Sequence, residues 1–175
     1  ALALALREAR GCERLAVGLP FANRPSQRFK MTLGSFVHVC PVFVEVGGRE
    51  SFPALRERLE RQITSAARHQ HYAVANPIGD PVYDVVLNVH KRIPLVKEFG
   101  GASVRVDWLT SGAADPVLRL NVREFGGNGG LSLDLDCRET LLDADTQGSL
   151  LGRIAELLED GIAPKDKDVA RGRAR

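Results

Sequence analysis

Apolar and polar residues alternate with a period of two in two neighbouring segments of the last third of the chain. Leu118, Leu120 and Val122 alternate with Arg119, Asn121 and Arg123, and Leu131, Leu133 and Leu135 alternate with Ser132, Asp134 and Asp136. Each segment is therefore predicted to be a strand with one dry and one wet face. The glycine-rich residues 126–130 between them predict a hairpin.

Helical periodicity marks three other segments. Residues 1–10 favour a helix that ends at Gly11. Ser51 can cap a second helix, in which four inward-facing positions recur every four residues: Leu55, Leu59, Ile63 and Ala67. A third helix is predicted to start at Asp143 or Asp145 and to end at Gly161, with these residues inward: Leu150, Leu151, Ile154, Leu157 and Leu158.

Further apolar runs predict strands at residues 14–19, 33–45, 83–89 and 103–109. Pro20 is predicted to end the first of these strands. Pro41 has no amide hydrogen and so marks a bulge, an edge or a kink in the second. A loop is expected around Pro25, and residues 91–101 are expected to be irregular. The pattern predicts an α/β fold with a mixed or largely antiparallel sheet flanked by helices, without regular βαβ repetition.

Composition and charge narrow the function classes. The chain has 175 residues, of which 44% are hydrophobic, and this fits one domain with a sizeable core. The formal charge is +2, and five basic and two acidic residues in the tail 164–175 contribute +3, so the remainder carries about −1. This balance argues against a nucleic-acid-binding surface within the fold. The tail could touch an acidic partner, but a solvated, disordered end is favoured.

Membrane and redox signals are weak. No apolar run reaches the roughly 20 residues that span a bilayer. Three cysteines without a C-x-x-C pair predict neither a zinc knuckle nor a disulfide framework, so the expected location is the reducing cytoplasm. The chain begins in a helix-favouring segment without an initiator methionine, and we expect it to be a piece of a larger protein.

Histidines are the first candidates for chemistry. His69 and His71 could offer two imidazoles to a metal, but no third ligand is near in sequence, so no metal site is predicted. His69 is interpreted as an imidazole that binds backbone carbonyls at a helix end. His38 lies in an apolar strand, where a neutral, hydrogen-bonded core histidine is favoured over a general base.

The remaining candidates have structural interpretations as well. Cys40 lies in so apolar a stretch that its thiolate is disfavoured. Asp134 and Asp136 share the wet face of a strand, and two such carboxylates are usually solvated. The glycine-rich residues 126–130 precede a strand rather than a helix, which argues against a phosphate cradle.

The chain contains LGSFVHV at residues 33–39, HQHYAV at residues 69–74 and GLPFANR at residues 18–24. These segments resemble motifs of nonribosomal peptide synthetase condensation domains, in the chloramphenicol-acetyltransferase-like superfamily. The fifth motif, Ile/Val-Gly-x-Phe-Val-Asn-Thr, is matched by Leu33, Gly34, Phe36 and Val37, with His38 and Val39 in place of Asn and Thr. The sixth, His/Asn-Gln-Asp-Tyr/Val-Pro-Phe-Glu, is matched by His69, Gln70 and Tyr72, with His71 for Asp and Ala73-Val74 for Pro-Phe. Asn76-Pro77 and residues 80–85 match the seventh loosely, and Arg24 fits the arginine of a Gly-x-Pro-x-x-x-Arg run.

The resemblance implies that residues 1–163 are the C-terminal lobe of a condensation domain, followed by the basic tail or linker 164–175. In the family, two lobes form a tunnel that takes the phosphopantetheine arms of two carrier proteins, and an amide bond forms between their acyl thioester and amine. The catalytic motif His-His-x-x-x-Asp-Gly lies in the other lobe, and no His-His pair occurs here. The expected partners are therefore carrier proteins and the N-terminal lobe, with no cofactor bound directly.

The resemblance also implies a set of residues on the acceptor-side wall of the tunnel: Arg24, Gly34, Phe36, His38, His69, Gln70 and Tyr72. It supplies no catalytic residue, so the isolated chain is predicted to be inactive. The departures at His38, His71 and Ala73-Val74 leave open a degenerate domain that recruits another enzyme to a carrier-bound peptide. An unrelated binding protein with an acyltransferase fold is a further alternative.

Overall fold

A computed structural model describes residues 1–24, 26–47, 51–72, 82–93, 98–104, 118–125, 131–137, 140 and 142–162. The helices are α1 (Leu2–Arg10), α2 (Gln27–Lys30), α3 (Phe52–Arg68) and α4 (Ala144–Ile162). The strands are β1 (Arg14–Phe21), β2 (His38–Glu45), β3 (Val85–Ile93), β4 (Glu98–Phe99), β5 (Ala102–Ser103), β6 (Leu118–Phe125) and β7 (Leu131–Asp136). The predicted turn at 126–130 and the tail at 164–175 lie outside the described residues.

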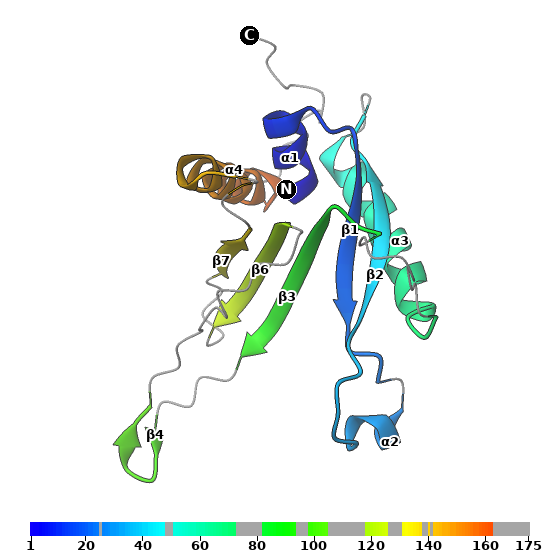
Figure 1. Ribbon diagram of the computed structural model, residues 1–175, viewed down its shortest axis with the longest axis vertical. Coiled ribbons are helices and arrows are strands. Elements are labelled where there is room, and N and C mark those ends of the chain that lie inside the picture. Colours follow the sequence, from blue (N-terminus) through cyan, green and yellow to red (C-terminus); the bar gives the residue numbers. More distant parts are fainter. Residues whose placement is uncertain are drawn as a thin grey trace.

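The main sheet is mixed, as predicted, with the strand order β2-β1-β3-β6-β7. β1 runs antiparallel to β2, β6 runs antiparallel to β7, and β3 runs parallel to both β1 and β6. The pairing of β1 with β3 joins Val17 to Val85 and Gly18 to Val86, beyond which the two strands diverge (Figure 1). β4 and β5 form a separate hairpin that projects from the same end of the sheet as α2, on its opposite side (Figure 1).

One face of the sheet makes the core. The register places Val17, Val85 and Leu118 on the same face, and this face packs against α1, α3 and α4 through Leu4, Leu55 and Ile154 among others. Leu120 and Ile154 are each only 1% exposed. The opposite face carries the polar residues of β3, β6 and β7. We call it the open face.

The edge prediction for Pro41 is confirmed. β2 is the first strand in the sheet order, and Pro41 lies opposite Gly18 of β1 in an unbroken antiparallel register. An edge strand tolerates proline because one side of the strand has no ladder partner. Pro20 does not end β1, which continues to Phe21. Beyond Gly18 the neighbour β3 has diverged, so Pro20 also lies where a second ladder is not required.

The predicted inward face of α3 is partly wrong. Leu55 is buried and Leu59 packs against the core, but Ile63 is 38% exposed, and Ala66 rather than the predicted Ala67 packs against the core. An α-helix has 3.6 residues per turn, so positions taken strictly every four residues drift around the helix. The N-terminal prediction holds, because the Ser51 hydroxyl oxygen accepts a hydrogen bond from the Ala54 amide at 3.4 Å.

Other boundaries differ from the sequence prediction. β2 begins at His38 rather than at residue 33, and α2 occupies part of the expected loop around residue 25. β3 continues to Ile93, and β4 lies within the stretch that was expected to be irregular. Of the strand expected at 103–109, Ser103 belongs to β5 and residues 105–109 lie outside the described part.

The last helix starts and ends slightly differently from the prediction. The Asp143 carboxylate accepts a hydrogen bond from the Thr146 amide at 2.7 Å and caps α4, and this bond holds the pKa of Asp143 below its usual value. The helix passes Gly161 and ends at Ile162. Leu150 and Ile154 are buried, and Leu151, Leu157 and Leu158 pack against the core, so its inward face is confirmed.

An ion pair between Glu8 and Arg153 joins α1 to α4. Its two contacts measure 2.6 Å and 3.0 Å, and the hydrogen bond from Arg153 holds the pKa of Glu8 below its usual value. We expect Glu8→Gln to lower the free energy of unfolding at neutral pH by less than about 1 kcal/mol, because both side chains are partly exposed and screened. A depressed folded-state pKa gives stability that is present above about pH 4.5 and is lost as the pH falls further.

This expectation is tested by urea denaturation of both proteins at several pH values. The difference between wild type and Glu8→Gln should shrink as the solution is acidified. Glu45→Gln is the matched control, since the pair of Arg14 with Glu45 is 84% and 62% exposed and should contribute less at every pH. A difference that stays constant down to pH 3 would contradict the assignment.

Candidate functional site

Arg24 organises the loop between β1 and β2, residues 22–37, which we call the β1–β2 loop. Its guanidinium donates hydrogen bonds to the carbonyl oxygens of Phe29, of Thr32 at 2.7 Å and of Gly34 at 2.8 Å. The same guanidinium lies 4.4 Å from the centre of the Phe36 ring. The rings of Phe29 and Phe36 pack edge to face, with their centres 5.9 Å apart. A planar guanidinium suits this role because its five N–H donors point in fixed directions.

Two positions of the matched motifs require glycine, each for a different steric reason. Gly34 has φ +135°, a conformation that side chains with a Cβ rarely adopt. Gly18 has an ordinary backbone, but a Cβ there would lie 2.8 Å from the Val39 Cγ1 atom and 2.9 Å from the Tyr83 ring. The first glycine shapes the β1–β2 loop, and the second permits close packing between β1, β2 and the residues before β3.

The end of α3 is tied to the β1–β2 loop through Asn23. The Gln70 side chain donates to the Ala67 carbonyl at 2.8 Å and accepts from the Asn23 amide at 3.1 Å. His71 Nδ1 lies 2.7 Å from the Asn23 side-chain oxygen. Asn23 has φ +49°, a conformation that asparagine tolerates better than most residues. Asn23 therefore forms one structural unit with Gln70 and His71, from which it is separated by 47 and 48 positions in the sequence.

The interpretation of His69 is confirmed. Its Nδ1 lies 2.8 Å from the Ser65 carbonyl oxygen in the last turn of α3. The rings of His69 and Tyr72 lie 6.3 Å apart, and Tyr72 is 74% exposed. His38 is partly buried at the start of β2, opposite Phe21 in the register. Asp84, from the loosely matched seventh motif, accepts a hydrogen bond from the Ala16 amide at 2.8 Å and links β3 to β1.

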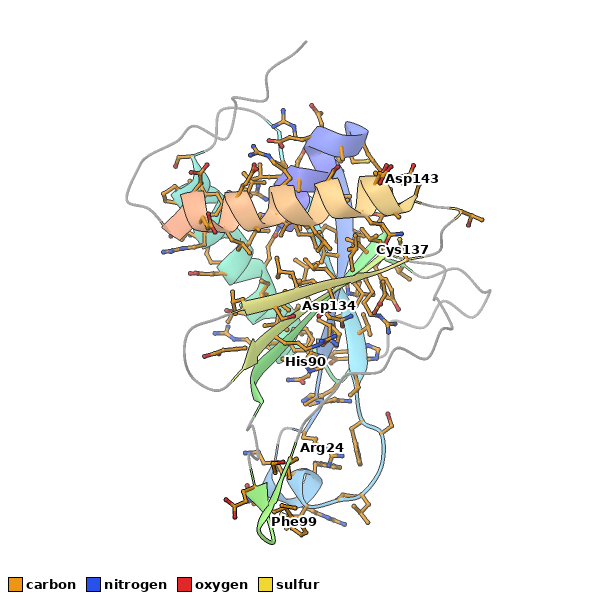
Figure 2. All side chains as sticks on the ribbon, turned by 90° about the vertical axis from the view of Figure 1, so that its left-hand side faces the viewer. Arg24, His90, Phe99, Asp134, Cys137 and Asp143 are labelled. Atoms are coloured by element: carbon orange, nitrogen blue, oxygen red, sulfur yellow. The ribbon has the colours of Figure 1, made fainter. Side chains whose placement is uncertain are left out.

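The seven residues predicted for the tunnel wall thus gather where β1 ends, β2 begins and α3 ends. Arg24, Gly34 and Phe36 contact one another, His69 and Tyr72 contact each other, and Gln70 joins the two groups through Asn23. His38 shares their end of the sheet through the pairing with Phe21. Figure 2 shows Arg24 in the projection beyond the sheet.

The residues gathered at this end of the sheet can shape a binding surface and form hydrogen bonds. Within the described residues no group of three metal-binding side chains occurs. Burial raises the pKa of the Cys40 thiol, as expected from its apolar strand. Burial, followed by the Asp136 charge, raises the pKa of the Cys137 thiol. Neither cysteine is therefore poised as a thiolate nucleophile.

A polar row on the open face was missed by the sequence interpretation. Asp134 binds Arg123 at 2.9 Å, and Asp136 accepts a hydrogen bond from the Asn121 amide group at 2.9 Å. Asn121 in turn contacts Asn88, which contacts His90. The interpretation of the two aspartates as merely solvated was wrong. The available signal was the shared parity of polar positions on β3, β6 and β7, but the strand register was needed to use it.

None of the described helices is long and apolar enough to cross a membrane.

Comparisons with known proteins agree on one family. Residues 1–80 match the family model of the condensation domain. The chain is 23% identical over 177 residues to the hybrid PKS-NRPS synthetase opdA of Penicillium oxalicum, covering 95% of this chain and 4% of that protein. It is 22% identical over 168 residues to the nonribosomal peptide synthetase tcpP of Claviceps purpurea, covering 93% of this chain and 8% of that protein.

Solved structures show the same fold. A mutant of the starter condensation domain of the rhizomide synthetase RzmA matches with a TM-score of 0.82 and 21% identity, over 98% of this chain and 42% of that one. The first condensation domain of the calcium-dependent antibiotic synthetase matches with a TM-score of 0.74 and 18% identity, over 98% and 39%. The chain spans less than half of each of these structures. Residues 1–80 are thus similar to the condensation domain family, and the chain has the fold of part of a condensation domain.

Proposed function

We propose that the chain forms one lobe of a condensation domain that joins a carrier-bound acyl thioester to a carrier-bound amine in nonribosomal peptide biosynthesis. The observation that carries the proposal is the unit around Asn23. Gln70 and His71 bind Asn23, and the next residue, Arg24, binds Gly34 and Phe36, so segments that match separate family motifs are linked at one end of the sheet. Loops that are held by hydrogen bonds at the end of a sheet are suited to forming the rigid wall of a binding channel.

The role proposed for this lobe is positional. The wall residues Arg24, Gly34, Phe36, His38, His69, Gln70 and Tyr72 would border the channel that receives the phosphopantetheine arm of the acceptor carrier protein. Holding amine and thioester together supplies most of the acceleration in such a transfer. Proton transfer is assigned to the N-terminal lobe, because the hydrogen-bonding groups described at this end already hold the loop and the helix end in place.

The proposal extends to partners and boundaries. The partners are two carrier proteins, whose phosphopantetheine arms bring the substrates, and the N-terminal lobe of the same domain. Residues 1–163 make up the lobe, and residues 164–175, which lie outside the described part, make up the linker.

Photo-crosslinking in the complete synthetase tests the wall. The acceptor carrier protein is loaded with an aminoacyl group that bears a diazirine, irradiated, and the labelled residues are mapped by mass spectrometry. We expect labels within residues 33–38 and 69–72. The internal control is the polar hollow on α3 lined by Glu57, Glu60, Arg61, Thr64, Ser65 and Arg68. Labelling of that hollow, with none at the predicted wall, would refute the proposed function.

A further inference from the structure

A chain of side-chain hydrogen bonds crosses three strands on the open face. It runs from Asp136 on β7 to Asn121 on β6 at 2.9 Å, then to Asn88 on β3 at 3.2 Å. The Asn88 nitrogen that meets Asn121 also lies 2.8 Å from His90 Nε2. Asn88 and Asn121 are direct partners in the strand register, and Asn121 is only 8% exposed. Figure 2 shows His90 and Asp134 on strands of the main sheet.

The carboxylate at one end fixes the direction of the whole chain. An ionised carboxylate only accepts hydrogen bonds, so Asn121 must turn its NH₂ group toward Asp136. The Asn121 carbonyl oxygen then faces Asn88, which must donate a hydrogen bond from its own NH₂ group. That NH₂ group also faces His90 Nε2, which must therefore accept. Reversing either amide would place two oxygens, or two donors, against each other in a partly buried site.

We propose that Asp136 is a positioning residue that acts through Asn121 and Asn88 to hold His90 in the tautomer with its proton on Nδ1. The two asparagines transmit the polarity of the carboxylate across the sheet over three hydrogen bonds. His90 thereby has a defined donor nitrogen, Nδ1. These residues lie on β3, β6 and β7 and are distinct from the wall residues, so the inference does not depend on the proposed function.

The neighbouring charges do not replace Asp136 in this role. Asp134 lies on the same strand and face, but it binds Arg123 and accepts from Ser132 at 3.4 Å. Arg119 and Arg123 flank Asn121 on the same face of β6. Asp134 therefore offers a matched control, since Asp134→Asn removes the same charge from the same strand and leaves the three hydrogen bonds to His90 intact.

The test is the tautomer of His90, measured by two-dimensional ¹⁵N–¹H NMR of histidine-labelled protein at a pH of about 8.5, well above the ordinary histidine pKa of about 6.5. His90→Gln assigns the signal among the four histidines. We expect wild type and Asp134→Asn to show Nε2 without a proton and Nδ1 with one. Asp136→Asn should lower the ratio of this tautomer to the other at least fivefold, because an amide at position 136 can present either an oxygen or an NH₂ group to Asn121.

A second variant covers the case in which Asp136→Asn does not fold. Asn88→Ala cuts the last link and should cause the same tautomer change, with the circular dichroism spectrum showing the fold. A merely structural role for Asp136 would lower stability without moving the tautomer ratio. Wild-type His90 with its proton on Nε2, or an unchanged ratio in both Asp136→Asn and Asn88→Ala, would overturn the proposal.

Discussion

Replacing Leu120 with alanine is expected to lower the free energy of unfolding by about 2–5 kcal/mol. Leu120 is 1% exposed and lies at the middle of β6, opposite Leu87 of β3 and Leu135 of β7 on the core face. Truncation there loses buried apolar surface and leaves a cavity between three strands that are held in fixed register. A loss of this size is a large share of the 5–15 kcal/mol that stabilises a typical domain.

Leu131→Ala is the matched control for this prediction. It makes the same chemical change on the neighbouring strand β7, at a side chain that is 54% exposed. We expect it to cost less than about 1 kcal/mol, since surface substitutions usually change stability little. Urea denaturation followed by circular dichroism measures both variants. Equal losses in the two would contradict the assignment of Leu120 to the buried core and of Leu131 to the exposed margin of the same face.

Arg24→Ala is expected to release the β1–β2 loop. The substitution leaves the carbonyl oxygens of Thr32 and Gly34 without their charged donor and removes the cation from the Phe36 ring. Hydrogen bonds to charged groups contribute about 1.5–3 kcal/mol each, less where they are solvent-exposed as here. Amide hydrogen exchange in residues 29–37 should therefore accelerate at least tenfold, which corresponds to about 1.4 kcal/mol of local opening free energy.

Two further variants sharpen this measurement. Arg28→Ala removes an arginine from α2 in the same loop, and its exposed side chain has no assigned role in holding the loop, so exchange should change little. Arg24→Lys should behave almost like Arg24→Ala, because an ammonium group is compact and cannot reach several carbonyls in the guanidinium geometry. If exchange is unchanged in Arg24→Ala, the loop is held by other contacts and the role given to Arg24 is wrong.

Local periodicity correctly predicted the helices and strands whose secondary structure follows from their own pattern of apolar and polar residues. The hairpin partners β6 and β7 and the inward face of α4 follow from alternation and from helical spacing. The start of β2 did not follow, because its partner strand β1 ends at Phe21 opposite His38, and the carbonyls of residues 32 and 34 bind the Arg24 guanidinium. Periodicity describes a segment's preference, and a side chain from outside the segment decided the outcome.

The sequence predicted individual residues of the candidate site but not the contacts between them. Motif resemblance identified Gln70 and Arg24 separately, but the hydrogen bond between Gln70 and Asn23, the residue before Arg24, joins residues 47 positions apart and exists only in the folded chain. The row from Asp136 to His90 carries no motif at all. It required the strand order and register, which bring three polar strand faces together.

Amide formation by separated lobes tests the central claim most directly. The purified 175-residue chain is assayed with acyl and aminoacyl carrier proteins, alone and after mixing with the separately expressed N-terminal lobe of the same synthetase, and the product is measured by mass spectrometry. We predict no amide product from the chain alone and product formation in the mixture. Turnover by the chain alone, abolished by substitution of His38 or His71, would contradict the claim that this lobe builds a wall and leaves proton transfer to its partner.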